Sequence, residues 1–207
     1  MLFRSDTTAT PGPVTITITA LGRAPDNKTI RRGGAKLGDL VFVTGTIGDA
    51  GGGLAILKGE GGSLSPAERE ALVSRYRLPE PRLAFGQMLI GLANSSLDVS
   101  DGLFADLGHI ADASRARIVF AADKIPLSDA LKKLWGNDAL LRAAACGDDY
   151  EIAFTAPPDK RNMVLAAAKT SGLPLSEIGR VETGEGIILR DEGGTPLPVS
   201  RAGYKHF

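Results

Sequence analysis

The sequence has little cysteine, histidine or aromatic content, and neither sign of charge is in excess. Its 207 residues contain one cysteine, Cys146, which excludes an intramolecular disulfide framework and fits a reducing compartment. Lysine plus arginine number 24, as do aspartate plus glutamate, so the formal net charge is zero. This balance argues against an extended polyanion such as a nucleic acid as the main partner, while a small anionic ligand stays compatible.

Long apolar runs are also missing. No stretch approaches the roughly 18 apolar residues of a membrane-spanning helix, and the start MLFRSDTTATPGP does not have the pattern of a signal peptide. We therefore expect no membrane association and a cytoplasmic protein. Only His109 and His206 are available as imidazole partners, so we expect Cys146 to be a buried structural thiol rather than a nucleophile.

Segments typical of strands and helices alternate along the chain, which predicts an α/β or α+β fold. The length is enough for one domain, or for one domain plus a fragment of another. Strands are expected at 14–22, at 39–45, around Asp98, at 118–121, at 152–155, and near Ile178 and Ile187. Helices are expected at 66–76, at 82–93, after Asp101, at 128–135, at 139–145 and at 159–171.

An acidic cluster, Asp98 to Gly102, lies where a strand-like run meets a helix-like run. Asp98 and Ser100 alternate along the strand and project to one face, and Asp101 in the following turn can approach the same point. Such oxygen ligands favour Mg²⁺, which commonly bridges carboxylates and the phosphates of a nucleotide. The alternative is that Asp101 only caps the next helix.

A second acidic cluster, CGDDYE at 146–151, immediately precedes another apolar strand. Two acidic clusters at strand ends suggest a site that handles phosphate. The alternative is that Asp148 and Asp149 form an ordinary solvated turn at the bend marked by Gly147. By composition and spacing alone, neither cluster identifies a reaction.

The glycine-rich stretch TGTIGDAGGGLAIL invites comparison with phosphate-binding loops, because glycine lets backbone N–H groups approach an anion at a helix N-terminus. It matches neither a Walker A loop nor G-x-G-x-x-G, so a tight, closely packed strand-to-helix turn is the favoured interpretation. Upstream, Arg31, Arg32 and Lys36 either meet phosphates or form a solvated basic loop.

Taken in order, these motifs resemble the thiamine-monophosphate kinase family of the aminoimidazole ribonucleotide synthetase-like superfamily. The resemblance covers nearly the whole chain. Its landmarks are DTTATPGPVTITITALG, RRGGAKLGDLVFVTGTIGDAGGGLAIL, LDVSDGLFADLGHI, GDDYEIAFT and the terminal GYKHF. The resemblance implies the C-terminal domain of that fold, with a mixed sheet packed against helices and a remnant strand of the N-terminal domain.

The resemblance further implies Mg²⁺-assisted, direct in-line transfer of a phosphoryl group from ATP to thiamine monophosphate, giving thiamine diphosphate, with no residue assigned as acid or base. Asp6, Asp98 and Asp101 match metal-binding aspartates. Ser5, Asp6, Arg32 and Ser100 match positions that bind ATP. Asp148 and Tyr204 match positions that contact the substrate, and an aromatic ring suits the cationic thiazolium.

The chain departs from this family at its start. Family members carry roughly another hundred residues before the Asp6 motif, and Arg4 and Ser5 replace an expected glycine pair. We expect a truncated chain in which 1–29 is a remnant of the N-terminal domain and 30–207 is the C-terminal domain. Full-length members are expected to be homodimers. The alternatives are a non-catalytic module that binds nucleotide or thiamine phosphate, and another ATP-dependent enzyme of the superfamily.

Overall fold

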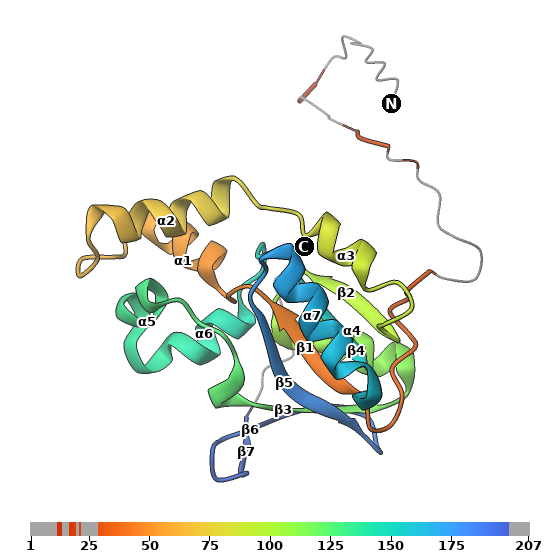
Figure 1. The fold of residues 1–207 in the computed structure, drawn as a ribbon. Helices are drawn as coiled ribbons and strands as arrows, with labels where there is room; N and C mark the ends of the chain where they lie inside the picture. The colour runs from red at the N-terminus through yellow and green to blue at the C-terminus, as the bar shows by residue number, and fades with distance from the viewer. Residues whose placement is uncertain (1–11, 14–16, 20, 22–28, 199–207) are drawn as a thin grey trace.

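The protein is described by a computed structural model, which covers residues 12–13, 17–19, 21 and 29–198 (Figure 1). Within these residues the chain forms one seven-stranded sheet with helices on both faces. The strands are β1 (Leu40–Thr44), β2 (Ser95–Val99), β3 (Arg117–Ala121), β4 (Glu151–Ala156), β5 (Leu175–Glu182), β6 (Gly186–Arg190) and β7 (Pro196–Leu197).

The strands lie in the order β2-β4-β1-β5-β3-β6-β7. All neighbouring pairs are antiparallel except β3 and β6, which run parallel. The sheet is therefore mixed, and the predicted α/β architecture is confirmed. Strand β2, which carries Asp98, lies at one edge of the sheet and pairs only with β4 among the described strands.

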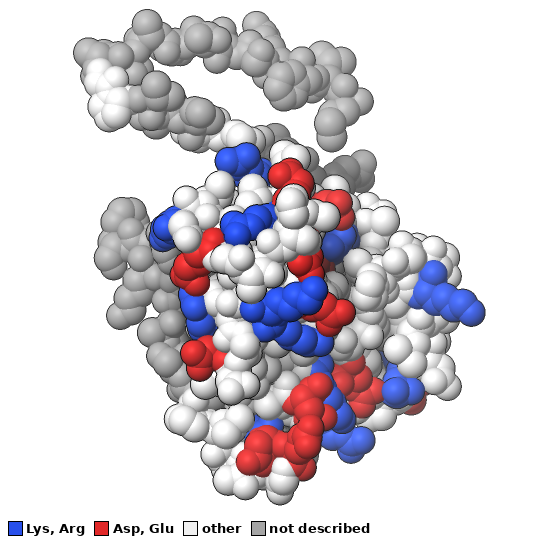
Figure 2. Space-filling view, turned by 90° about the vertical axis from the view of Figure 1, so that its left-hand side faces the viewer, with Lys and Arg blue, Asp and Glu red and all other residues white. Residues whose placement is uncertain are grey.

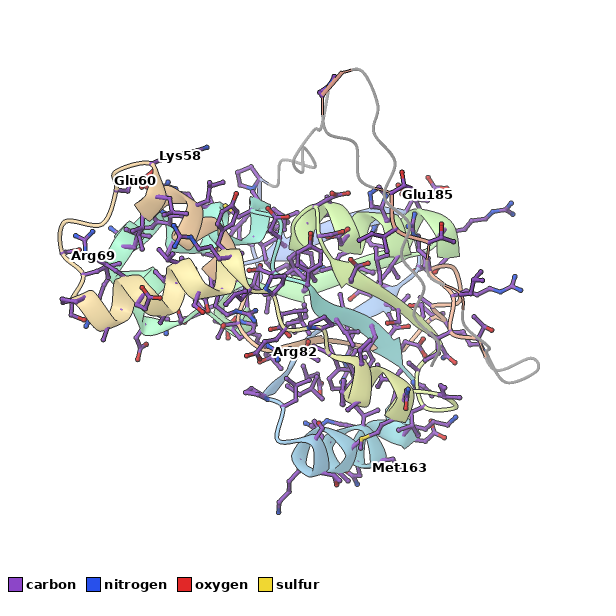
Figure 3. The ribbon with its side chains drawn as sticks, turned by 90° about the horizontal axis from the view of Figure 1, so that it is seen from above. Lys58, Glu60, Arg69, Arg82, Met163 and Glu185 are labelled. Atoms are coloured by element: carbon purple, nitrogen blue, oxygen red, sulfur yellow. The ribbon has the colours of Figure 1, made fainter. Side chains whose placement is uncertain are left out.

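Strand β1 lies near the middle of the sheet and is buried on both faces, as its continuous apolar run predicts. Val41 and Val43 pack on the face covered by α4 (Leu103–Ser114). Leu40 and Phe42 point the opposite way, toward α3 (Leu83–Met88) and α7 (Arg161–Ser171). In Figure 3 helix α7, marked by Met163, and helix α4 lie on opposite sides of the sheet.

Four further helices form a separate group beside the sheet, with a small apolar core of their own (Figure 1). They are α1 (Asp49–Leu57), α2 (Pro66–Arg77), α5 (Asp129–Trp135) and α6 (Ala139–Ala145). Figure 2 shows the molecule from this side, where acidic and basic side chains lie next to one another. Glu60 and Arg142, for example, form an ion pair of 3.1 Å.

Helix α2 begins where the sequence predicts it, because Ser65 is the N-cap residue and Pro66 occupies the first helical position, where proline is favoured. The Ser65 hydroxyl accepts a hydrogen bond from the backbone N–H of Glu68, whose carboxylate accepts one from the backbone N–H of Ser65. This reciprocal capping box satisfies two backbone donors that the first helical turn leaves without a partner.

Most predicted elements are confirmed, with three differences. The helix predicted at 82–93 is limited to α3, and the two-residue strand β7 was not predicted. The strand predicted at 14–22 lies largely outside the described residues. Within that range, 17–19 and 21 form no strand, and the side chains of Ile18 and Leu21 are 87% and 95% exposed. No helix in the described part of the chain combines the length and apolar character that crossing a bilayer requires.

Candidate functional site

The two acidic motifs meet at one end of the β2–β4 pair. Because these strands are antiparallel, the end of β2 lies beside the start of β4, with Val99 opposite Glu151. The backbone N–H of Asp148 donates to the carbonyl oxygen of Ser100 at 3.0 Å, and the N–H of Tyr150 donates to that of Val99 at 2.8 Å. The structure therefore brings the predicted residues Asp98, Ser100, Asp101 and Asp148 to one place, which we call the acidic edge.

Two glycines allow this close approach of backbones. A Cβ atom on Gly147 would overlap the carbonyl oxygen of Ser100. Gly102 has a φ of 108°, and a Cβ atom there would lie 2.9 Å from the carbonyl oxygen of Ala145. Only glycine fits at either position, for steric reasons at Gly147 and for both steric and conformational reasons at Gly102.

Asp106, one turn into α4, fixes the turn that carries Asp101. Its carboxylate accepts hydrogen bonds from the backbone N–H groups of Ser100 at 3.0 Å and Asp101 at 3.1 Å. Burial raises the pKa of Asp106 to about 6, and the nearby Asp101 adds to this rise. Helix α4 begins after Gly102 without a side-chain cap, so the alternative in which Asp101 caps the helix is wrong.

The carboxylates of the acidic edge are open to a cation. Asp98 and Asp148 are exposed and Asp101 is half-buried. None of the three forms an ion pair with a lysine, arginine or histidine of the described residues. Possible ligand atoms of Asp101, Asp106 and His109 lie within 4.8 Å of one another. A set of uncompensated carboxylate oxygens suits a hard divalent ion such as Mg²⁺.

Tyr150 lies against these acids. Its hydroxyl donates a hydrogen bond of 3.3 Å to Asp148. Partial burial raises the pKa of Tyr150, and the negative charges of Asp148, Asp98 and Asp101 raise it further. Both Asp148 and Tyr150 adopt left-handed backbone conformations, with φ of 68° and 51°. Such conformations are costly for residues other than glycine and tend to gather at functional sites.

A groove of about 670 Å³ adjoins the acidic edge. Asp98, Tyr150 and Ile152 form its floor, and residues between 79 and 90 form its wall. Most of its lining is apolar, with a few polar groups, as in typical small-molecule sites. No sequence motif indicated this groove, because its wall is a proline-containing connection and the short helix α3.

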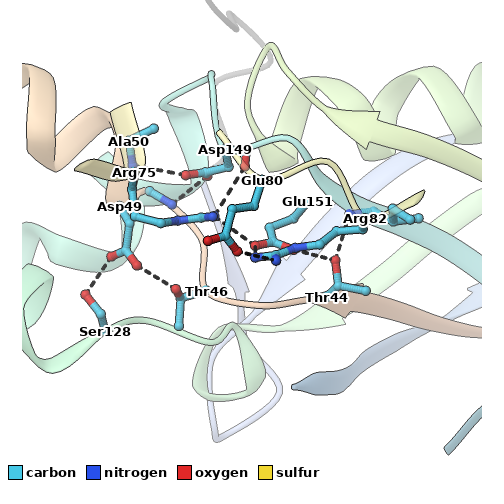
Figure 4. A network of polar contacts seen from close by, with 12 residues as sticks. Thr44, Thr46, Asp49, Ala50, Arg75, Glu80, Arg82, Ser128, Asp149 and Glu151 are labelled. Atoms are coloured by element: carbon cyan, nitrogen blue, oxygen red, sulfur yellow. Dashed lines mark hydrogen bonds and ion pairs between the residues drawn. The ribbon is translucent and has the colours of Figure 1, made fainter. Parts of the chain in front are cut away.

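The glycine-rich segment proves to be a structural turn. Gly48 caps α1 with a φ of 86°, and the buried carboxylate of Asp149 accepts hydrogen bonds from the N–H groups of Gly48 at 2.6 Å and Ala50 at 3.2 Å (Figure 4). A side chain of the protein thus takes the place that a phosphate would occupy. The phosphate-loop interpretation is wrong, and so is the solvated-turn interpretation for Asp149.

A buried charge network behind the acidic edge escaped prediction. Glu151 is fully buried and accepts hydrogen bonds from Thr44 at 2.6 Å, from Arg75 at 2.8 Å and twice from Arg82, at 2.9 and 2.6 Å (Figure 4). Arg82 also pairs with the exposed Glu80 at 3.0 Å. Through Arg75 of α2 and Arg82 of the groove wall, the network connects both segments to Glu151, the first residue of β4, which follows Tyr150 in the chain. Two arginines far from Glu151 in sequence gave no signal of this pairing.

Arg32 is placed away from the acidic edge. Its side chain is exposed, and the following residues pack at the C-terminal end of α4, where the N–H groups of Gly34 and Ala35 donate to the Ser114 hydroxyl at 3.2 and 3.1 Å. Asp101 precedes the opposite end of the same helix. Ser5, Asp6 and Tyr204 lie outside the described residues.

Cys146 occupies a packing position, as expected. It is half-buried, burial raises the pKa of its thiol, and a Cβ atom on Gly51 would collide with its sulfur. A thiol with a raised pKa is mostly protonated near neutral pH and is a poor nucleophile. The close contact with Gly51 shows that Cys146 packs directly against α1.

This fold, with its acidic turn between β2 and α4, defines a known class of domain. Residues 36–192 match the family described as AIR synthase related protein, C-terminal domain, and the chain belongs to that family.

Within this class, the chain is 40% identical over its whole length to thiamine-monophosphate kinase of Escherichia coli K12, of which it covers 63%. It is 38% identical to the Caulobacter vibrioides enzyme of the same name, over 99% of the chain and 58% of the relative. The chain therefore spans about three fifths of the length of these relatives.

Solved structures show the same relationship. Thiamine-monophosphate kinase from Stenotrophomonas maltophilia superposes with a TM-score of 0.76 at 40% identity, over 80% of this chain and 54% of that one. AaThiL complexed with AMPPCP and TMP gives 0.71 at 37% identity, over 86% and 54%. Escherichia coli HypE, a hydrogenase maturation protein, gives 0.66 at 22% identity over 88% and 56%, a likeness of fold alone.

Proposed function

We propose that this chain forms the C-terminal part of a thiamine-phosphate kinase, which phosphorylates thiamine monophosphate with ATP to give thiamine diphosphate and ADP. Relatives at 37–40% identity carry the name thiamine-monophosphate kinase, and one similar structure holds AMPPCP, an ATP analogue, with TMP. In this proposal, residues 30–207 are the C-terminal domain and residues 1–29 belong to the preceding one. The full-length protein is proposed to be a homodimer.

The observation that carries the proposal is the hydrogen bond from the backbone N–H of Asp148 to the carbonyl oxygen of Ser100, which holds the two acidic motifs together. It gathers three carboxylates, none of them neutralised by a cation among the described residues, around one turn. An uncompensated acidic site is costly unless a cation completes it. Asp98 and Asp101 would hold Mg²⁺, with Asp6 as a further ligand, and Mg²⁺ would neutralise the charge of the phosphates when bound.

In the proposed reaction, an oxygen of the substrate phosphate attacks the γ-phosphorus of ATP, and the bond from the γ-phosphorus to the bridging oxygen breaks. A phosphate monoester is already largely anionic near neutral pH, so no side chain has to remove a proton. The protein mainly aligns the two phosphates. Ser5 and Ser100 are proposed to bind the nucleotide at the acidic edge, and Arg32, which lies toward the other end of α4, to contact a part of the nucleotide away from this edge. Asp148 and Tyr204 are proposed to bind thiamine monophosphate.

Titration of the 207-residue chain with AMPPCP, with and without Mg²⁺, tests the metal assignment. We expect Asp98→Asn to weaken Mg²⁺-dependent binding at least tenfold. Asp123→Asn, an equally conservative change at an exposed aspartate remote from the acidic edge, should leave it unchanged. Equal affinities with and without Mg²⁺ would contradict the assignment.

Formation of thiamine diphosphate from ATP and thiamine monophosphate tests the reaction itself. Turnover that Asp98→Asn abolishes would support a kinase. Binding of both ligands without turnover would instead favour the alternative of a non-catalytic binding module.

A further inference from the structure

We propose that Asp106 and His109, on successive turns of α4, are positioning residues for a metal ion at the acidic edge. Asp106 fixes the backbone of the turn that carries Asp101, and His109 orients the Asp101 carboxylate toward the ion. This inference rests on the proposed function, in which Asp98 and Asp101 hold Mg²⁺, and it adds two residues of α4 that support one of these ligands.

The two proposed ligands are held in different ways. Asp98 lies on β2, opposite Ile152 of β4 in a regular antiparallel pair, so the sheet itself fixes its backbone. Asp101 lies beyond the end of β2, in the turn before α4 begins at Leu103. It precedes Gly102, a residue type that restricts the backbone less than any other. Asp101 therefore depends on contacts outside the sheet to hold its carboxylate in place.

Asp106 provides one of these contacts. Its Oδ2 atom accepts two hydrogen bonds, from the N–H of Ser100 at 3.0 Å and from the N–H of Asp101 at 3.1 Å, so one oxygen fixes two consecutive peptide groups. Asp106 is 2% exposed and forms no ion pair with a cation of the described residues. A buried carboxylate without an ion-pair partner is costly. Its place here is explained by the turn that it holds rather than by packing.

His109 approaches Asp101 from the next turn of α4. It follows Asp106 by three residues, so the two side chains are neighbours on the helix surface. Its exposed ring offers a nitrogen that lies within 4.8 Å of ligand atoms of both Asp101 and Asp106. Mg²⁺ usually keeps several of its water molecules. A ring nitrogen this close to the Asp101 carboxylate can hydrogen-bond such a water molecule and so limit the orientation of the carboxylate.

The chemistry of the donor atoms separates positioning from direct ligation. Mg²⁺ prefers oxygen ligands, whereas imidazole suits zinc, copper, nickel and iron. The Oδ2 atom of Asp106 is already occupied by two backbone donors. Residues that hold metal ligands in place commonly change the metal affinity by about 10- to 100-fold when they are replaced. Asp106 and His109 should therefore control the affinity for the ion without coordinating it.

Binding of Mn²⁺ to the 207-residue chain tests this role, because Mn²⁺ is a paramagnetic substitute for Mg²⁺ whose free concentration can be measured by EPR. Asp106→Ala removes the acceptor for both N–H groups, whereas Asp106→Asn keeps an amide oxygen that can accept them but removes the charge. His109→Ala and His109→Gln form a second pair, in which Gln keeps a polar group. Asp123→Asn, at an exposed aspartate remote from the acidic edge, is the control.

We expect Asp106→Ala to bind Mn²⁺ about 10- to 100-fold more weakly than the original chain, and Asp106→Asn to stay within about threefold of it. His109→Ala should weaken binding several-fold, His109→Gln should recover part of this loss, and Asp123→Asn should change nothing. Pulsed EPR of the bound Mn²⁺ should show no coupling to an imidazole nitrogen. If Asp106→Ala does not fold, Asp106→Leu, which fills the same buried volume without an acceptor, takes its place.

Unchanged Mn²⁺ affinity in Asp106→Ala would limit Asp106 to a role in stability and overturn its positioning role. Equal losses in Asp106→Asn and Asp106→Ala would do the same, because Asp106 would then act through its charge or as a ligand. A nitrogen coupling, or unchanged affinity in His109→Ala, would overturn the role of His109.

Asp98→Asn, measured alongside, separates this inference from the proposed function. If the original chain binds no Mn²⁺, or Asp98→Asn binds it equally well, the metal assignment of the proposed function fails. If Asp98→Asn loses affinity while the Asp106 and His109 variants keep it, only the positioning inference fails.

Discussion

The carboxylate of Asp149 accepts a hydrogen bond of 2.6 Å from the backbone N–H of Gly48, more than a hundred residues earlier in the chain. This contact fixes the start of α1 against the segment that carries Asp148. A carboxylate is favoured at a helix N-terminus by the exposed N–H groups and the helix dipole. The glycine-rich turn and the acidic edge are therefore one structural unit, in which the Asp149 carboxylate accepts hydrogen bonds from the N–H groups of the turn.

Asp149 should make the stability of the protein depend on pH. Burial raises its pKa from 3.8 to about 7, so the folded state holds a proton that the unfolded state releases between these values. The stabilisation is full below about pH 4 and is lost as pH rises to about 7, by roughly 4 kcal/mol at about 1.4 kcal/mol per pKa unit.

Urea unfolding from pH 4 to 8 measures this dependence. Asp149→Asn, which does not titrate, should show a smaller decrease in unfolding free energy than the original chain. Asp106, whose pKa is also raised, is present in both proteins and cancels in the comparison. Parallel pH profiles for the two proteins would contradict the role given to Asp149.

Glu151 should be far more important for stability than the exposed Glu80, although both pair with Arg82. Replacing Glu151 by Gln leaves Arg75 and Arg82, whose side chains are only 20% and 17% exposed, without their shared counter-charge. We expect a loss of about 2 to 4 kcal/mol for Glu151→Gln. Glu80→Gln, at a side chain 74% exposed, should cost less than about 0.5 kcal/mol. Denaturant unfolding of both variants makes the comparison, and similar losses would refute it.

Hydrophobic periodicity and start signals were enough to predict most of the fold. β1 was predictable because it is buried on both faces and reads as a continuous apolar run. α6 begins and ends where expected, at Ala139 and Ala145. α3 was predicted too long because residues 89–93 remain largely apolar and pack in part against the core, while Gly91, with a φ of 80°, interrupts the helix and leaves only isolated helical hydrogen bonds such as that from the N–H of Ala93 to the carbonyl of Leu89 at 2.9 Å. β7, with two residues, is too short to produce a periodic pattern.

The candidate site was only partly predictable. Asp98, Ser100, Asp101 and Asp148 were found because each acidic motif stands at a predicted strand end, and strand ends are where a sheet gathers functional groups. Which strands are neighbours was not readable from a single sequence, so the pairing of β2 with β4 had to come from the structure. The ion pairs of Glu151 were hidden for the same reason, since they join residues about 70 positions apart.

The capping box at Ser65 gives a local test of how α2 is held. Ser65→Ala removes the acceptor for the N–H of Glu68 and should cost about 1 kcal/mol of unfolding free energy. Ser65→Thr keeps a hydroxyl and should recover most of this loss. Unfolding by urea, followed by circular dichroism, measures both changes. Equal stability of the Ala and Thr variants would show that the cap contributes nothing.

Gly147→Ala tests the junction on which the acidic edge depends. The new Cβ atom would overlap the carbonyl oxygen of Ser100, which already accepts the hydrogen bond from the N–H of Asp148, so the two motifs must separate. We expect a loss of about 1 to 3 kcal/mol in stability. Mg²⁺-dependent nucleotide binding should weaken at least tenfold, because the carboxylates no longer converge.

Gly62→Ala is the matched control for that substitution. A Cβ atom on Gly62 meets nothing within 4 Å, and its φ lies outside the left-handed region. The change removes conformational freedom from the unfolded chain and should be neutral or slightly stabilising. Urea unfolding of both variants measures the change in stability, and calorimetric titration measures the change in Mg²⁺-dependent nucleotide binding. If Gly147→Ala lost stability but kept its Mg²⁺-dependent affinity, the close approach of the two motifs would serve packing alone, and the acidic edge would not be the metal site.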